Sequence, residues 1–333
     1  MKKKLICFFL VFAGWGGVAH GTDSDWLKNW KFKGDFRVRY EGTDFDDEGT
    51  KTRNRGRYRL RLNADITISK NLSTHVRLAS GEGAATSTNQ SFDESFGGKD
   101  LFVDRAFLVY RTGGWKLGAG KMANPLTTTD IVWDSDVNPE GFYQSYSAER
   151  FYATLGEMMV EEESSAADTN LIVFQLGTKD PKGKWNVAAA YYNYLGHEIG
   201  GIDLDYQFID ALAALKFQLG ALPGSARFHV VKNVTSEITD EDTAWGVFAD
   251  LGRDKNPGDW KFSLKYARIE GFSSLELFTD SDFGFADKRG FSAAASFVSG
   301  SRLSWKVTTF FVDSIVAEDK GFNRIQVDGS LKF

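Results

Sequence analysis

Residues 53–68, RNRGRYRLRLNADITI, alternate between charged and apolar side chains. Arginine stands at every second position from Arg53 to Arg61, and apolar or aromatic residues stand at every second position from Tyr58 to Ile68. Successive side chains of a β-strand point to opposite faces, so this period of two predicts a strand with one polar and one apolar face. In a soluble protein the apolar face of such a strand meets a core. If the pattern recurs along the whole chain, the apolar face is expected to meet lipid.

The same alternation recurs from Trp30 to the end of the chain. Short connections such as Ser69–Asn71 interleave with longer ones such as Gly81–Lys99 and Gly271–Lys288, which is the layout of an outer-membrane barrel. About sixteen strands are expected in such a layout. After a first strand that begins at Trp30, the others are predicted at 53–68, 72–78, 101–111, 115–119, 141–147, 150–159, 169–178, 184–194, 208–219, 225–235, 243–252, 259–270, 289–299, 303–313 and 322–333.

The amino-terminal segment has the features of a secretory signal peptide. Lysines at positions 2, 3 and 4 precede the apolar run Leu5–Ala13, and small residues lead to Gly21. We therefore interpret residues 1–21 as a signal peptide and residues 22–333 as a single barrel domain. The one cysteine, Cys7, lies in the segment that would be removed, so disulfides, thiolate metal ligands and cysteine nucleophiles are not expected.

The last strand adds a second sign of export to a membrane. Residues 322–333, FNRIQVDGSLKF, alternate between polar and apolar positions and end on Phe333. They resemble the C-terminal strand of bacterial outer-membrane proteins, whose terminal aromatic residue is the signal for the barrel-assembly machinery. The alternative is an ordinary edge strand that happens to end in phenylalanine.

Composition agrees with a membrane barrel. The chain has 34 glycines, 28 phenylalanines, 11 tyrosines and 9 tryptophans against 5 prolines, as expected for half-apolar strands with aromatic girdles. No segment after the first approaches the ~20 consecutive apolar residues of a membrane helix, which excludes a helical membrane protein. Without the signal peptide, 37 basic side chains stand against 45 acidic ones. This net negative charge gives no support to nucleic-acid binding.

With these features the chain resembles the putative porin family of Gram-negative bacteria, which is related in plan to the phosphate-selective porins. The residues that carry the resemblance are Gly120-Lys121, Asn124-Pro125 and the stretch WDSDVNPEG at 133–141. The resemblance implies an all-β fold, a transmembrane antiparallel β-barrel of about sixteen strands in the outer membrane, with residues 122–140 folded inward as a constriction loop. It also implies contact with outer-membrane lipid and lipopolysaccharide, assembly by the barrel-assembly machinery, and a homotrimer.

Polar positions of a barrel strand are expected to face the lumen, because an arginine that faces lipid at mid-membrane costs roughly 2–4 kcal/mol. The pattern therefore predicts a basic wall on neighbouring strands, made of Arg37, Arg39, Arg55, Arg57, Arg59, Arg61, Arg77 and Arg105. The third loop offers opposing carboxylates at Asp130, Asp134, Asp136 and Glu140. Across a narrow water-filled passage the two sets would create a transverse field that selects small ions by charge and size.

Two other interpretations of these residues stay open. The arginines could pair with the loop acids and with carboxylates such as Asp65 and Asp104, and hold the loop without selecting a solute. Alternatively, the arginine row could be a ladder for phosphate or another oxyanion, because a guanidinium binds such groups through two parallel hydrogen bonds. The acidic loop argues against the ladder.

A metal site has weak support in the sequence. Asp134, Asp136 and Asn138 have the alternate spacing of oxygen ligands in a calcium loop, but Pro139 and Ser145 stand where that loop has glycine and glutamate. The competing interpretation is a turn whose Asp and Asn side chains bond to their own backbone. We expect no metal and no cofactor.

Catalytic patterns are equally weak. After the signal peptide only His75, His197 and His229 remain, on separate segments, and neither H-E-x-x-H nor G-x-S-x-G occurs. An enzyme is therefore not expected. The expected function is passive diffusion of small hydrophilic solutes and ions through an outer-membrane channel. The alternatives are an anion-selective or phosphate-selective channel, and a structural or adhesion barrel that does not conduct.

Overall fold

The alternating strands form one closed β-barrel in the computed structural model, which describes residues 26–47, 49–92, 94–162, 168–199, 202–317 and 320–333. The predicted signal peptide, with Cys7, lies outside these residues. The helical elements within the described ranges are the 3-10 turns η1 Trp26–Asn29, η2 Glu94–Phe96 and η3 Glu276–Phe278. None of the helices in this part of the chain is long and apolar enough to cross a membrane.

Sixteen long strands form the wall within the described residues. They are β1 Trp30–Phe45, β2 Arg53–Thr67, β3 Leu72–Ser80, β5 Leu101–Thr112, β6 Trp115–Lys121, β7 Glu140–Ser147, β8 Phe151–Glu161, β9 Thr169–Lys179, β10 Trp185–Ile199, β11 Ile202–Leu219, β12 Leu222–Asn233, β13 Thr243–Gly252, β14 Trp260–Ile269, β15 Lys288–Val298, β16 Leu303–Ser314 and β17 Phe322–Lys332. The two-residue strand β4 Gln90–Ser91 pairs with β2 beside Arg57 and Tyr58.

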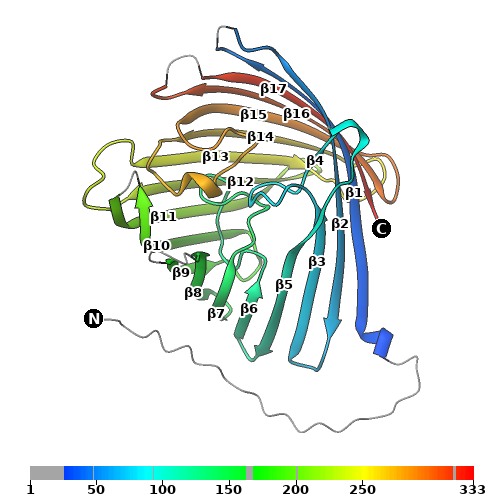
Figure 1. Ribbon diagram of the computed structural model, residues 1–333. Coiled ribbons are helices and arrows are strands. Elements are labelled where there is room, and N and C mark those ends of the chain that lie inside the picture. Colours follow the sequence, from blue (N-terminus) through cyan, green and yellow to red (C-terminus); the bar gives the residue numbers. More distant parts are fainter. Residues whose placement is uncertain (1–25, 48, 93, 163–167, 200–201, 318–319) are drawn as a thin grey trace.

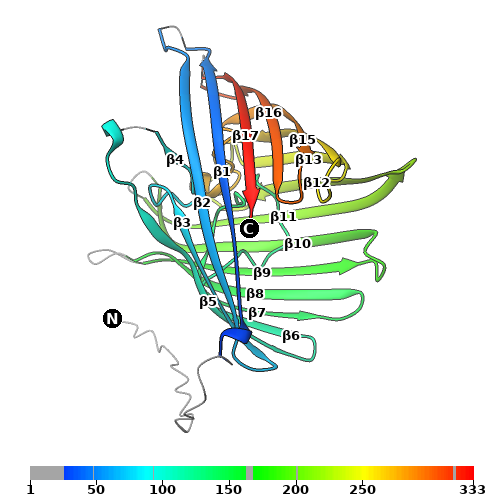
Figure 2. The same ribbon diagram turned by 90° about the vertical axis from the view of Figure 1, so that its right-hand side faces the viewer.

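Antiparallel pairing of consecutive long strands builds the ring (Figure 1). β1 pairs with β2 on one side and with β17 on the other, and this second pairing closes the barrel. Figure 2 shows these three strands side by side at the seam. The predicted all-β antiparallel barrel with about sixteen strands is thereby confirmed.

The two faces of each strand differ as the alternation predicts. On β14 the apolar side chains of Phe262 and Leu264 are 49% and 60% exposed, whereas Lys265, one residue further on, is only 8% exposed. The exposed face of the wall is therefore apolar, and the polar side chains are gathered on the inner face. This is the reverse of a soluble protein and the arrangement expected of a barrel surrounded by lipid.

Aromatic side chains form two rows on the outer face of β14, β15 and β16. Trp260, Phe297 and Trp305 are neighbours in the register of the three strands, and the rings of Trp260 and Phe297 lie 4.8 Å apart. A second row, Tyr266, Phe291 and Phe311, lies six residues further along each strand. Six residues of strand span roughly 20 Å, so the rows have the placement of the aromatic girdles that flank a membrane barrel.

A β-bulge interrupts the alternation on β5. Arg77 of β3 is opposite Arg105, and the next residue, Leu78, is opposite Val103, so Asp104 has no partner across the strand pair. The extra residue turns Asp104 inward, where it is 3% exposed, while Arg105 also reaches an interior partner, Asn138. Bulges re-aim side chains in this way.

The structure differs from the predicted strand bounds mainly on the side of the long connections. β1 continues to Phe45, into the acidic stretch that precedes β2, because its last residues still pair with β2 and β17. β10 and β11 extend through most of the stretch that separates the predicted strands 184–194 and 208–219. The register shifts after Tyr194, and Gly196 has a φ of +70°, an irregularity that hides the period of two in this stretch.

The assignment of the outer face to lipid predicts opposite effects of arginine at adjacent positions of β14. Leu264→Arg would place a guanidinium against the membrane and should lower the free energy of unfolding by roughly 2–4 kcal/mol. Ser263→Arg should be tolerated, because Ser263 faces inward and donates a hydrogen bond to Asp250 at 2.6 Å. Urea unfolding in phospholipid vesicles measures both variants. Equal destabilisation by the two would contradict a lipid-facing wall.

Candidate functional site

The segment between β6 and β7, residues 122–139, packs against the inner face of the wall. Its Ile131 and Val132 are at most 1% exposed. Hydrogen bonds attach the segment to three strands: Thr127 N–H donates to Gln175 of β9 at 2.8 Å, the Trp133 indole N–H donates to Tyr194 of β10 at 3.3 Å, and the Thr129 hydroxyl bonds His229 of β12 at 2.7 Å. The segment is thus held to the side of the ring from β9 to β12.

An apolar core lies between this segment and the wall. Trp133 meets Tyr192 edge-on, with ring centroids 6.1 Å apart, and Tyr192 stacks on Phe208 at 4.4 Å. Tyr192 and Phe208 are fully buried although both belong to the inner face of a barrel. Such aromatic pairs add about 0.5–1.5 kcal/mol each beyond the burial of their area. The segment is therefore fixed by apolar packing as well as by hydrogen bonds.

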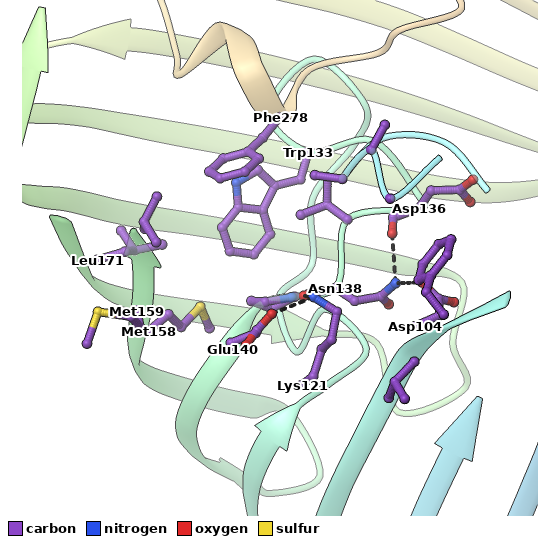
Figure 3. A pocket seen from close by; sticks show the side chains of 18 residues that line it. Asp104, Lys121, Trp133, Asp136, Asn138, Glu140, Met158, Met159, Leu171 and Phe278 are labelled. Carbon is purple, nitrogen blue, oxygen red and sulfur yellow. Dashed lines mark hydrogen bonds and ion pairs between the residues drawn. The ribbon is translucent and has the colours of Figure 1, made fainter. Parts of the chain in front are cut away.

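A second segment, residues 270–287 between β14 and β15, packs on the first. In the sequence this stretch is recognisable only as the long connection Gly271–Lys288. Backbone hydrogen bonds join the two segments, from Asp134 N to Phe278 O at 2.7 Å and from Asp280 N to Asp130 O at 3.0 Å. The Trp133 and Phe278 rings lie edge to face at 6.3 Å, as Figure 3 shows. The two segments therefore form one body.

The two segments carry the same tripeptide, Asp-Ser-Asp, at 134–136 and at 280–282. In each, the backbone N–H of the second aspartate donates to Oδ1 of the first at 2.9 Å. The turn at 134–136 is the Asp turn that the sequence offered as the alternative to calcium binding, and 280–282 repeats it. The second aspartate of each pair is left to bind a wall arginine, Arg61 for the first segment and Arg39 for the second.

Most arginines of the predicted basic wall form ion pairs with nearby carboxylates. The carboxylates come from strands β1 and β17 as well as from the two segments. The ion pairs are Arg39 with Asp328 at 2.7 Å and with Asp282 at 3.1 Å, Arg59 with Asp35 at 2.6 Å, Arg57 with Glu41 at 3.5 Å, and Arg55 with the same Glu41. Arg37 donates a hydrogen bond to Asn89 at 2.5 Å. These pairings neutralise much of the arginine charge.

Six polar side chains meet where the first segment approaches β2, β3 and β5. We call them the interior cluster: Arg61, Arg77, Asp104, Arg105, Asp136 and Asn138. Arg61 pairs with Asp136 at 2.6 Å, and Arg77 pairs with Asp104. Asn138 connects the two parts, because its amide donates to the backbone oxygen of Asp136 and to Asp104, each at 2.8 Å. Its side-chain oxygen accepts from Arg105 at 2.6 Å.

The four predicted loop acids have different surroundings. Asp136 is the one among them that pairs with the described arginine row. Asp130 pairs with Lys265 of β14 at 3.0 Å, and Glu140 pairs with Lys121 at 2.6 Å. Asp134 accepts backbone hydrogen bonds from the two segments. The structure thus brings one predicted acid to the arginine row, and the other three have different partners.

Burial and neighbouring charge give the segment aspartates different pKa values. Burial, followed by the neighbouring carboxylate of Asp280, raises the pKa of Asp134 from its usual 3.8 to about 8. Burial acts in the same direction on Asp136, but the charge and hydrogen bond of Arg61 outweigh it and hold the pKa of Asp136 below its usual value. Asp134 is thus the proton-binding member of the first Asp-Ser-Asp.

Two cavities border the interior cluster. One, of about 400 Å³, lies between the first segment and the wall strands β5 and β8, and is shown in Figure 3 with Asp104, Asp136 and Asn138 at its edge. The other, of about 540 Å³, contains Arg37, Arg59 and Arg77 in its lining. Because Arg77 pairs with Asp104, the same ion pair borders both cavities.

The two histidines whose side chains are described serve as polar anchors of the inner face. His75 bonds Asp65 at 2.7 Å, and His229 lies between Thr129 and Asp210. The described residues include no group of three or more His, Cys, Asp or Glu side chains placed to hold a metal ion.

Sequence reasoning missed Lys265, Asp282 and Asp328 as interior partners. Lys265 bridges Asp130 and Asp280, and so connects both segments to β14. The alternation of polar and apolar residues along β14 places Lys265 on the inward face, but no nearby residue in the sequence indicates its partners. For Asp282, the repeat of the Asp-Ser-Asp sequence at 134–136 and 280–282 was a signal from which its role could have been inferred.

Residues 47–202 match the family model of the putative porins. The resemblance expected from the sequence is confirmed by this match, which covers the wall from β2 to β10, including the first interior segment. No curated protein sequence matches the chain at a significant level.

Solved porin structures share the fold. A double mutant of the Rh. blastica porin aligns with a TM-score of 0.57 at 11% identity, over 91% of this chain and 100% of the other. OmpF of Salmonella typhi in complex with daunomycin aligns at 0.59, with 11% identity, over 91% and 97%. A loop-deletion mutant of OmpT from Vibrio cholerae aligns at 0.51, with 12% identity, over 92% and 100%. At these identities the likeness concerns the porin barrel as a fold.

The raised pKa of Asp134 predicts that the interior segments pack more firmly at lower pH. A carboxyl group with a pKa of about 8 in the folded state and 3.8 otherwise binds more protons when folded, so stability is lost as pH rises through this window. Hydrogen exchange of residues 130–137 and 276–283, corrected for the intrinsic rate, should therefore be faster at pH 8.5 than at about pH 6.

Asp134→Asn should remove this pH dependence and keep protection high, because the amide is neutral throughout. Asp242→Asn is the matched control on an exposed connection. Its hydrogen bond from Lys232 lowers the pKa of Asp242, so its contribution is constant above neutral pH. An unchanged pH response in Asp134→Asn would show that another group controls the packing.

Proposed function

We propose that the chain is an outer-membrane porin through which small hydrophilic solutes and ions diffuse down their gradients. The observation that carries the proposal is the position of the Arg77–Asp104 ion pair. Asp104 lines the cavity of about 400 Å³, and Arg77 lines the cavity of about 540 Å³. A solute that moves from one cavity to the other passes this pair, so the interior cluster acts as the filter.

Filtering in the cluster differs from the open transverse field expected from the sequence. Arg61, Arg77 and Arg105 stand against Asp104 and Asp136, and the acids contact the bases directly. A small ion that enters therefore exchanges partners with a paired side chain. Charge selection of this kind depends on the balance of charged groups in the narrow part of a pore. With three arginines and two aspartates, that balance is slightly positive.

The seam between β1 and β17 supports the proposed role of Phe333 in assembly. The Phe333 N–H donates to Gly34 O at 3.0 Å, and the Gly34 N–H donates to Phe333 O at 2.7 Å. A Cβ added at Gly34 would lie 2.5 Å from the Phe333 ring, so only glycine leaves room for it. A terminal strand that is recognised during assembly and then closes the barrel on β1 accounts for this fit.

Further parts of the proposal rest on the resemblance to porins. The protein would be exported through a signal peptide at residues 1–21 and would contact outer-membrane lipid and lipopolysaccharide through its apolar outer face. It would assemble as a homotrimer, with residues 122–140 as the constriction loop. The contacts of residues 122–139 with β2, β9 and β12 support this last assignment.

A barrel that does not conduct is the competing function. It is favoured by the apolar core around Trp133 and by the Arg61–Asp136 and Arg39–Asp282 pairs, which join the interior segments to the wall. In that case the segments would act as a plug and the extracellular connections would bind a partner.

Conductance in planar bilayers separates these functions, and single charge changes test the filter. Asp136→Asn should shift the reversal potential in a KCl gradient toward anion preference, and Arg61→Gln should shift it toward cation preference. One charge within a few ångströms of the path changes the energy of an ion by about 1 kcal/mol, or roughly fivefold in the permeability ratio. Asp242→Asn, far from the cluster, should leave the potential unchanged. Absence of conductance in folded protein would overturn the porin assignment.

A further inference from the structure

The barrel wall is open between β5 and β8, at the end that carries the long connections. β6 has seven residues and β7 eight, against twelve in β5 and eleven in β8. β6 ends at Lys121, opposite Ala106 of β5, and β7 begins at Glu140, opposite Met159 of β8. Beyond this height, residues 101–105 of β5 pair with β3 alone among the described strands. The chain leaves the wall here and turns inward as the first segment.

The cavity of about 400 Å³ occupies this opening (Figure 3). Its lining includes Val103 and Met159, which belong to the outer face and are 52% and 41% exposed. It also includes the residues next to them, Asp104 and Met158, which face inward and are 3% and 2% exposed. A cavity behind a closed wall would be lined by inward-facing side chains alone. This cavity therefore reaches from the interior to the outer face of the barrel.

The inner end of the cavity is apolar and aromatic. Trp133, Met158 and Leu171 close it and are buried. Figure 3 shows the Phe278 ring against the Trp133 indole at the same end. Aromatic rings pack well on other rings, edge to face or offset, and the thioether of methionine makes favourable contacts with ring edges. The inner end therefore suits an apolar group, and an aromatic ring in particular.

The polar groups of the lining differ in what they can offer to a ligand. Asp104 and Asp136 are each held by an arginine of the interior cluster. At the rim, Lys121 and Glu140 pair with each other at 2.6 Å, but their side chains remain 31% and 61% exposed. The rim thus presents a donor and an acceptor within reach of water, whereas the inner carboxylates are occupied.

We propose that this cavity binds a small amphipathic solute, an aromatic ring with one short polar end. The ring packs against Trp133, Met158 and Phe278, and the polar end meets Lys121 and Glu140 at the rim. The inference deepens the proposed porin function and rests on it, since the bound molecule is a solute that enters the passage. Sites for small ligands are concave and mostly apolar, with a few placed polar groups, and a volume of about 400 Å³ is typical of them.

A single thiol in the lining reports whether the cavity is occupied, because residues 22–333 contain no cysteine. Ala85 lines the cavity and is exposed, so the thiol of Ala85→Cys should react readily with a maleimide. In the folded protein in detergent, with the free probe concentration fixed by dialysis, 3-phenylpropanol should slow this reaction. Propanol has the same polar end without the ring and should not slow it. Ser236→Cys, on an exposed connection outside the lining, should be unaffected by either probe.

Three results would overturn the site. The first is the same reaction rate of the Ala85→Cys thiol with and without 3-phenylpropanol. The second is a thiol that is unreactive before any probe is added, because another chain or a lipid would then cover the opening. The third is protection by dodecanol alone, which would make a membrane acyl chain the occupant in place of an aromatic solute.

Met159→Ala is the decisive variant, combined with the reporter thiol. Met159 is on the exposed outer face, so its truncation should leave the fold intact while removing an apolar contact from the cavity. The concentration of 3-phenylpropanol that gives half protection should rise about fivefold. Leu155→Ala is the matched control: Leu155 also faces outward on β8, is 40% exposed and is outside this lining. Equal half-protection concentrations in the two variants would overturn the site.

The bilayer measurement keeps the two proposals apart. Steady KCl conductance without protection of the thiol would leave the porin function intact and remove the aromatic site. Protection that depends on Met159, in a protein that does not conduct, would retain the site and remove the porin function. Conductance that 3-phenylpropanol lowers in the wild type and in Leu155→Ala, but far less in Met159→Ala, would support both.

Discussion

Guanidinium groups on the inner face of β2 require counter-charges, and much of the interior is arranged to supply them. The strict period of two leaves no other face for these arginines, because the opposite face is apolar and exposed. Burying a charge without a partner is costly, whereas a hydrogen-bonded pair recovers most of that cost. The neighbouring strand β1 supplies Asp35 to Arg59, and Glu41 to Arg55 and Arg57. Arg61 receives Asp136 from the first interior segment. The second segment brings Asp282 to Arg39 of β1 in the same way.

Apolar packing determines where those segments lie. A segment held only by ion pairs would loosen as salt screens them. Here Trp133, Phe278 and Phe283 bring their own core into the barrel and bury it against Tyr192 and Phe208. The interior is consequently divided: one side is filled by an apolar core, and the side of β1, β2 and β3 keeps the arginine charges and the cavity of about 540 Å³. This division explains why polar side chains on β9 to β12 serve mostly as anchors.

The wall could be predicted from the sequence almost residue by residue, and the interior could not. The predicted strand 243–252 coincides with β13, because a wall between lipid and water imposes the alternation at each position. The interior segments obey no such period, and their partners are far away in the chain. Asp134 and Asp136 look equivalent in the sequence. Yet Asp134 accepts backbone hydrogen bonds whereas Asp136 reaches Arg61, because the turn between them points the two carboxylates apart. The arginine row was found by its pattern, but the pairing of Arg39 with Asp282 and Asp328 depends on contacts between distant parts of the chain, which only the closed ring creates.

The bulge in β5 allows two consecutive charged side chains of one strand to face the lumen. In a regular strand neighbouring residues face opposite sides, so a strand cannot offer two consecutive side chains to the same compartment. By inserting Asp104 without a cross-strand partner, β5 directs an acid and the adjacent base, Arg105, to the interior together. The residues on either side keep their facing, as Val103 remains exposed on the outer surface. One extra residue thus provides a local dipole inside the barrel, while the lipid-facing surface is unchanged. A bulge of this kind can therefore alter the charge of a lumen without any change in the number of strands or the size of the ring.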